Sequence, residues 1–140
     1  MQRVYHFLAV LFISVFVNAQ VFNQAIADEI QKVDSVINLL INYENIGPKP
    51  TGSPALVETL EWIVENYKDY GYVPIIDTFM LGSIESYNII IEKQGSIPNQ
   101  WIIIGAHYES VEESPGANDN GTGVISTLQI ARIINDLNPR

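Results

Sequence analysis

The stretch that most constrains this chain is residues 101–123, where an apolar run, a loop rich in carboxylates and glycine, and a helix start follow one another. The run over residues 101–106 is continuous, as expected of a strand that is buried on both faces of a sheet. His107 follows this run directly, and Asp119 stands where an amphipathic helix begins. Open α/β sheets bind ligands beyond the carboxyl ends of their strands, so this order predicts that His107 and Asp119 share one ligand site.

The remaining elements are predicted from apolar spacing and from turn residues. Apolar side chains three and four residues apart predict helices over residues 23–43 and 120–137. Ser53 followed by Pro54 favours the start of another helix, which Gly71 is placed to end. Runs of β-branched and aromatic residues predict three strands, over residues 73–80, 87–93 and 101–106. This order of helices and strands is typical of an α/β or α+β domain.

The predicted sheet is incomplete around residues 101–106. A strand that is buried on both faces needs a neighbouring strand on each side, and the sequence supplies a neighbour on one side alone. Three strands and three helices are also a thin core for a chain of this length. We therefore expect the chain to be the N-terminal portion of a larger domain.

The first residues have the pattern of a secretory signal peptide. Arg3 gives a short basic start, residues 7–17 are apolar, and Val17 and Ala19 fit the small-residue rule for cleavage before Gln20. A membrane anchor is the rival interpretation, but a span needs about 20 apolar residues. The sequence thus predicts a signal peptide over residues 1–19, a mature chain over residues 20–140 that is the N-terminal portion of its domain, and export to a periplasm or the extracellular space.

Charge and composition narrow the possible ligands. Cleavage would remove Arg3 and no acidic residue, leaving six basic and 16 acidic residues, a net charge of −10. Such a chain repels phosphate backbones, which argues against a nucleic-acid partner. The chain has no cysteine, so a metal would have to be held by His, Asp or Glu. His107 is then the one histidine left after cleavage.

His107, Glu109 and Asp119 have the side chains that a metal site needs. The imidazole of His107 can bind a divalent metal. Glu109, two residues on in extended backbone, points to the same side and could orient that imidazole. Asp119 lies among small residues, where the backbone can bend and bring its carboxylate to the histidine.

A plainer interpretation of the same residues stays open at this point. His107 could simply end a strand, and Asp119 or Asn120 could be an ordinary helix N-cap. Glu112 and Glu113 are expected to be solvated charges of the loop. A lone histidine and a lone aspartate do not establish a metal site by themselves.

Residues 105–110 and 115–123 together resemble the first metal-binding motif of the M28 family of zinc metallopeptidases. Residues 52–55, a Gly-Ser loop before a helix, and residues 87–91, a strand with Asn88 after an aromatic residue, resemble that family as well. The resemblance covers roughly residues 30–137. It implies a three-layer α/β/α zinc-exopeptidase-like domain with a mixed sheet.

The resemblance also assigns roles to the candidate residues. It implies a site of two zinc ions, with His107 as the terminal ligand of one ion and Asp119 as the carboxylate that bridges both. The family usually has aspartate where this chain has Glu109, so Glu109 is expected to support His107 with a longer arm. The resemblance further implies a cis peptide bond between Asp119 and Asn120.

The family's remaining site residues are expected beyond residue 140. They include a Glu-Glu pair, whose first member is the general base, a further acidic ligand and a second histidine; no general base is predicted in this chain. The expected function is that of an exported zinc-dependent exopeptidase, an aminopeptidase acting on peptides, with the 140-residue chain alone inactive. Two alternatives remain: a glutaminyl-peptide cyclase-like enzyme of the same fold with a single zinc, and a non-catalytic remnant or binding module.

Overall fold

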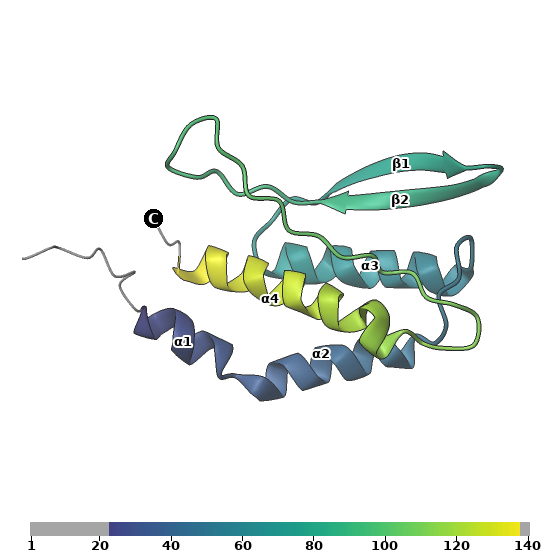
Figure 1. Cartoon of the computed structure of the whole chain (residues 1–140), viewed down its shortest axis with the longest axis horizontal. Helices are drawn as coiled ribbons and strands as arrows, with labels where there is room; N and C mark the ends of the chain where they lie inside the picture. The colour runs from purple at the N-terminus through teal and green to yellow at the C-terminus, as the bar shows by residue number, and fades with distance from the viewer. Residues whose placement is uncertain (1–22, 138–140) are drawn as a thin grey trace, which may run out of the picture.

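The computed structural model describes residues 23–137, in which α-helices lie on one side of a two-stranded β-hairpin (Figure 1). The predicted signal peptide over residues 1–19 lies outside the described residues. In chain order the elements are α1 (Gln24–Ile30), α2 (Val33–Asn45), α3 (Pro54–Asp69), β1 (Ile75–Leu81), β2 (Ile84–Ile90), a short π-helical turn η1 (Ala117–Gly121) and α4 (Thr122–Leu137). A mixed α/β class is therefore confirmed.

The first predicted helix is two helices, which corrects the expectation of one helix over residues 23–43. The break lies at Gln31 and Lys32, where the backbone of Lys32 leaves the helical region with ψ at 63°. Neither glycine nor proline marks this break in the sequence. A tertiary contact accompanies it, because Glu29 in α1 forms an ion pair of 2.6 Å with Arg132 in α4. Because Arg132 is distant in the sequence, the residues around Gln31 and Lys32 carry no pattern that would predict the break.

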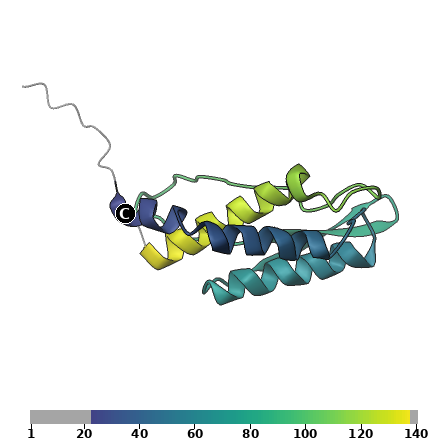
Figure 2. The ribbon, with the colours of Figure 1, turned by 90° about the horizontal axis from the view of Figure 1, so that it is seen from below.

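The helices α3 and α4 confirm their sequence predictions. The Ser53 side chain caps α3 by accepting a hydrogen bond from the backbone N–H of Leu56 at 3.1 Å, and Pro54 opens the first turn. Gly71 follows the helix with φ at 86°, a conformation that glycine adopts without strain. The apolar stripe of α4 is buried at Val124, Ile125, Leu128, Ala131 and Ile133. Seen from below, α2, α3 and α4 lie side by side (Figure 2).

The strands β1 and β2 form an antiparallel hairpin; the sequence predicted both strands, with shifted boundaries, and did not predict their pairing. Ile75 pairs with Ile90, and Leu81 pairs with Ile84 across a turn at Gly82 and Ser83. The second strand begins three residues before the predicted start at Tyr87. Its buried Ser86 faces the helices, whereas most other hairpin side chains are exposed.

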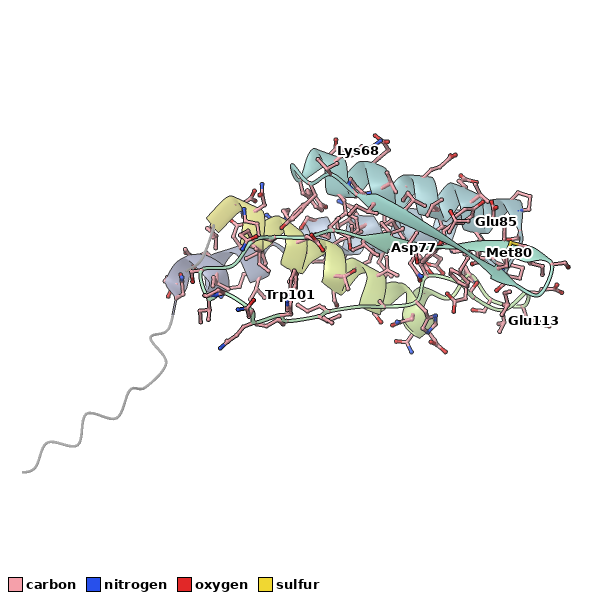
Figure 3. All side chains as sticks on the ribbon, turned by 90° about the horizontal axis from the view of Figure 1, so that it is seen from above. Lys68, Asp77, Met80, Glu85, Trp101 and Glu113 are labelled. Atoms are coloured by element: carbon pink, nitrogen blue, oxygen red, sulfur yellow. The ribbon has the colours of Figure 1, made fainter. Side chains whose placement is uncertain are left out.

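The segment 101–106 is not a strand in the structure, which corrects the prediction of a central strand buried on both faces. It has no strand pairing, and Ile102 and Ile103 are each 91% exposed. Trp101 stands on this outlying segment, and Glu113 lies on the loop beyond His107 (Figure 3). The physical reason is that no described strand lies beside it to hydrogen-bond its backbone or cover its side chains.

The core lies between the helices and the base of the hairpin, and tyrosine contributes much of it. Tyr43, Tyr67, Tyr72 and Tyr108 are buried together with the apolar stripe of α4. Each of the four hydroxyl groups finds an oxygen acceptor. Within residues 23–137, none of the helices has the length and apolarity to cross a membrane.

Candidate metal centre

His107 and Asp119 are brought into contact by the loop that joins them. Nε2 of His107 lies 3.2 Å from Oδ1 of Asp119. Asp119 belongs to η1, directly before α4, and its side chain is 88% exposed, whereas that of His107 is 48% exposed. The two side chains therefore lie together, as the sequence led us to expect. Their role as metal ligands remains a prediction.

Glu109 faces the opposite nitrogen of the same imidazole. Nδ1 of His107 lies 3.3 Å from the backbone carbonyl oxygen of Glu109 and 3.6 Å from its Oε1. Both groups are acceptors, so when Nε2 binds a metal ion they can accept the proton that remains on Nδ1. The longer arm of glutamate therefore still brings the carboxylate beside the imidazole, and the backbone carbonyl is the nearer of the two acceptors.

The facing pair of Nε2 and Oδ1 fits a bound cation. A bare imidazole nitrogen and a carboxylate oxygen both carry lone pairs, so they need a proton or a cation between them. Zinc binds nitrogen and carboxylate oxygen at roughly 2.0–2.2 Å, and two tetrahedral ligands of one ion then lie about 3.3–3.6 Å apart. The observed 3.2 Å lies close to the lower end of this range, so a small movement of either side chain would let both residues bind one ion. The donor set also consists of the histidine and carboxylate groups that zinc accepts.

The backbone around Asp119 has the predicted special geometry. The peptide bond between Asp119 and Asn120 is cis, as the family resemblance implied. Gly116 opens the turn with φ at 70°, and a Cβ added there would lie 2.8 Å from the carbonyl oxygen of Asp119. Only glycine fits this close approach without a shift of the backbone. The small residues noted in the sequence are thus required by the path of the chain.

The described part of the chain supplies only part of a metal site. Across residues 23–137, no cluster of three or more His, Asp or Glu side chains is arranged to hold an ion. Glu112 and Glu113 are both exposed on the loop, as expected of solvated charges. A complete zinc site would need further ligands in addition to His107 and Asp119.

A cavity of about 490 Å³ adjoins the histidine. It lies between the hairpin, the segment 104–109 and the helices α3 and α4, and His107 and Glu109 both line it. Its floor is apolar, with Leu56, Ile63 and Val124 from the core. The imidazole therefore borders a space with an apolar floor.

Two buried side chains beneath the loop were missed by the sequence analysis. Tyr43 and Lys49 are both 0% exposed, and Nζ of Lys49 lies 3.9 Å from the centre of the Tyr43 ring. Burial lowers the pKa of Lys49. Burial, with the charges of Glu109 and Asp119, raises the pKa of Tyr43 to about 12. The sequence offered one signal, a lysine placed between two prolines in a loop, and it does not reveal burial.

Comparison with known proteins shows which of them resemble the segment that contains His107 and Asp119. Residues 88–140 match Peptidase family M28. The chain is 43% identical over 49 residues to a "probable leucine aminopeptidase 2" of Aspergillus oryzae, covering 35% of this chain and 10% of that protein. It is 39% identical over 64 residues to "Aminopeptidase Y" of Saccharomyces cerevisiae, covering 46% and 12%. It is 28% identical over 91 residues to "Leupeptin-inactivating enzyme 1" of Streptomyces exfoliatus, covering 65% and 21%.

The matched segments span about a tenth to a fifth of the length of these relatives. The family match includes the whole loop from His107 to Asp119 and the helix α4 that follows it. The contact between His107 and Asp119 therefore lies inside the segment of this chain that matches Peptidase family M28.

Proposed function

We propose that this chain is the N-terminal portion of an exported zinc-dependent exopeptidase, an aminopeptidase that hydrolyses peptide bonds. The observation that carries the proposal is the 3.2 Å contact between Nε2 of His107 and Oδ1 of Asp119 inside the M28 segment. The aminopeptidase assignment draws support from relatives that bear this name. Peptides are the proposed substrate.

His107 and Asp119 are the residues that would hold zinc. By its resemblance to the family, the complete site would contain two ions with Asp119 between them. When bound, zinc acts as a Lewis acid and makes water a stronger nucleophile at neutral pH. In this proposal the chain contributes two ligand atoms that face each other: Nε2 of His107, with its lone pair free to bind the ion, and Oδ1 of Asp119.

Glu109 has a supporting role in this proposal. Its carbonyl oxygen and its carboxylate both lie near Nδ1 of His107, at 3.3 and 3.6 Å. A hydrogen bond there would hold the ring's orientation and make Nε2 a better ligand, as acceptors behind metal-binding histidines generally do. Glu112 and Glu113 are exposed on the loop, and we assign neither of them the role of general base. The base is proposed to lie in a longer protein.

Two observations support a longer protein with a three-layer α/β/α domain. The matched segments span only about a tenth to a fifth of the length of the relatives. The apolar side chains of residues 101–104 are exposed, beside a hairpin whose outer face is covered by no described element. Further strands would pair with this segment and turn it into the central strand that its composition favours. Export through residues 1–19 to a periplasm or the extracellular space completes the proposal.

The experiment begins with the coding DNA beyond codon 140. If the frame continues, the complete protein is expressed and assayed on a series of aminoacyl chromogenic substrates and on their N-acetylated forms. An aminopeptidase cleaves the former and spares the latter, and His107→Ala abolishes cleavage. Asp77→Ala, which changes an exposed carboxylate of β1, serves as the control and retains activity.

Three results would contradict the proposal in different ways. Conversion of N-terminal glutaminyl peptides with loss of ammonia, and no peptide cleavage, would indicate a cyclase-like enzyme. Full activity of His107→Ala would exclude the proposed metal centre. A stop codon after codon 140, with no zinc binding and no peptidase activity, would make the chain a non-catalytic remnant or a binding module.

A further inference from the structure

A buried cation lies beneath the loop that carries the candidate ligands. Lys49 is 0% exposed, and its Nζ donates hydrogen bonds to the carbonyl oxygens of Gly47 at 2.6 Å and Pro115 at 2.9 Å. The face of the Tyr43 ring forms its third contact. Among the described residues, no carboxylate forms an ion pair with it. Burying an ammonium group is costly, so these contacts are needed to stabilise it.

The backbone of Lys49 is tied to the same loop. Its N–H donates to Oγ of Ser110 at 2.8 Å, and its carbonyl oxygen accepts from the N–H of Ser110 at 3.0 Å. Ser110 Oγ in turn donates to the carbonyl oxygen of Ser114 at 2.8 Å. Side chain and backbone of Lys49 therefore hold the loop at Ser110 and at Pro115.

Tyr43 holds the parts of the loop that are nearest to the two candidate ligands. Its hydroxyl group donates to the carbonyl oxygen of Tyr108, the residue after His107, at 2.9 Å. Its ring packs against Gly121, two residues after Asp119, so closely that a Cβ there would lie 2.7 Å from the ring. One side chain on α2 thus contacts the backbone beside His107 and beside Asp119.

We propose that Tyr43 and Lys49 are positioning residues that set the separation of His107 and Asp119 by fixing the backbone of the loop between them. The inference rests on the proposed metal centre, because the distance between His107 and Asp119 matters only if the two residues bind the same ion. Neither residue touches the metal or the substrate. Their effect on metal affinity would come entirely from the positions of the two ligands.

The variant Tyr43→Phe tests the proposal, because it removes one hydrogen bond and keeps the ring. Tyr72→Phe is its matched control: Tyr72 is also buried, and its hydroxyl group donates to a backbone carbonyl oxygen, that of Ala131 in α4, at 2.8 Å. The two variants should lower the melting temperature of the full chain to a similar degree. In chelator competition with Zn²⁺, Tyr43→Phe should lower affinity about tenfold or more, and Tyr72→Phe should leave it unchanged.

A second measurement, on the metal-free full chain, separates this proposal from the proposed function. The amides of Ser110 and Gly121 donate to the carbonyl oxygens of Lys49 and Gly116, so their hydrogen exchange reports on the loop. Tyr43→Phe should speed both exchange rates about three- to tenfold relative to Tyr72→Phe. Lys49→Met should do the same relative to Lys68→Met, which changes an exposed lysine.

The outcomes are distinct. Equal exchange at Ser110 and Gly121 in Tyr43→Phe and Tyr72→Phe would overturn the positioning role, whatever the chain binds. Faster exchange in Tyr43→Phe, together with no zinc binding by the unaltered chain, would support the positioning of the loop and refute the proposed metal centre. Equal zinc affinity in Tyr43→Phe and the unaltered chain, where the latter binds zinc, would overturn the link between positioning and affinity.

Discussion

Nε2 of His107 lies 3.2 Å from Oδ1 of Asp119, with the acceptors of Glu109 behind the same ring. The imidazole is thus held between two carboxylates, one at each nitrogen. In the proposed metal centre, the ring proton is on the Glu109 side and the cation is shared on the Asp119 side.

The first prediction concerns this shared cation. His107→Ala and Asp119→Ala should each lower the affinity for Zn²⁺ at least about tenfold, because each removes a proposed direct ligand, which should matter no less than an outer partner. The double variant should lose little more than either single variant, since both residues hold the same ion and their effects do not add. Titration calorimetry measures all three affinities. Unchanged affinity in Asp119→Ala would show that Asp119 is not a zinc ligand.

The second prediction concerns Glu109. Glu109→Gln removes the charge behind Nδ1 but keeps the shape and the backbone carbonyl, so zinc affinity should fall about tenfold, at the low end of what such outer partners contribute. Glu112→Gln is the control, because it neutralises an exposed carboxylate of the same loop. Equal losses in the two variants would mean that the overall negative charge of the loop matters, and that Glu109 has no specific role.

The ends of helices and the contact between His107 and Asp119 were predictable because their causes are local. Ser53 caps α3, Gly71 follows it, and the small residues before α4 let Asp119 turn back to His107. These features depend on the conformational preferences of a few adjacent residues. The sequence therefore predicted which residues meet at the site.

The unpredicted features depend on distant partners. The break between α1 and α2 goes with the ion pair of Glu29 and Arg132, and the burial of Lys49 depends on Tyr43 and Pro115. The apolar run 101–106 favours a buried strand, but a strand also needs a neighbour to pair with, and none is described beside it. Composition sets a preference, and the partner decides whether it is realised.

The third prediction concerns alkaline pH. Burial and the charge of Glu109 raise the pKa of Tyr43 and of Tyr108 to about 12. An unfolded tyrosine ionises near pH 10, so between about pH 10 and 12 the unfolded chain holds fewer protons and the folded state loses stability. The loss should be roughly 2–3 kcal/mol for each tyrosine. Lys49 opposes it, because burial lowers its pKa and makes the folded state release that proton first.

Urea unfolding at a series of pH values measures this loss. The free energy of unfolding should be nearly level from about pH 8 to 9 and should fall steeply above about pH 10. Tyr43→Phe should reduce the fall, since phenylalanine does not ionise. A fall of the same size in Tyr43→Phe and in the unaltered chain would show that the Tyr43 phenol ionises as easily in the folded chain as in the unfolded one.

The fourth prediction concerns the exposed apolar segment before His107. Ile103 is 91% exposed, whereas Ile125 in α4 is 2% exposed. Ile103→Lys should therefore change the free energy of unfolding of the 140-residue chain by no more than about 0.5 kcal/mol, and it should reduce self-association measured by light scattering. Ile125→Ala should cost about 2–5 kcal/mol in the same urea experiment, because it leaves a cavity in the core.

The same substitution in a longer protein tests the proposed sheet. If further strands flank residues 101–106, Ile103 becomes a buried residue, and Ile103→Lys places an unpaired charge in the core. It should then cost several kcal/mol, far more than in the 140-residue chain. A small effect in both proteins would show that the segment stays at the surface and that no central strand forms there. A large effect in both would show that this segment is already packed in the shorter chain, contrary to the structure.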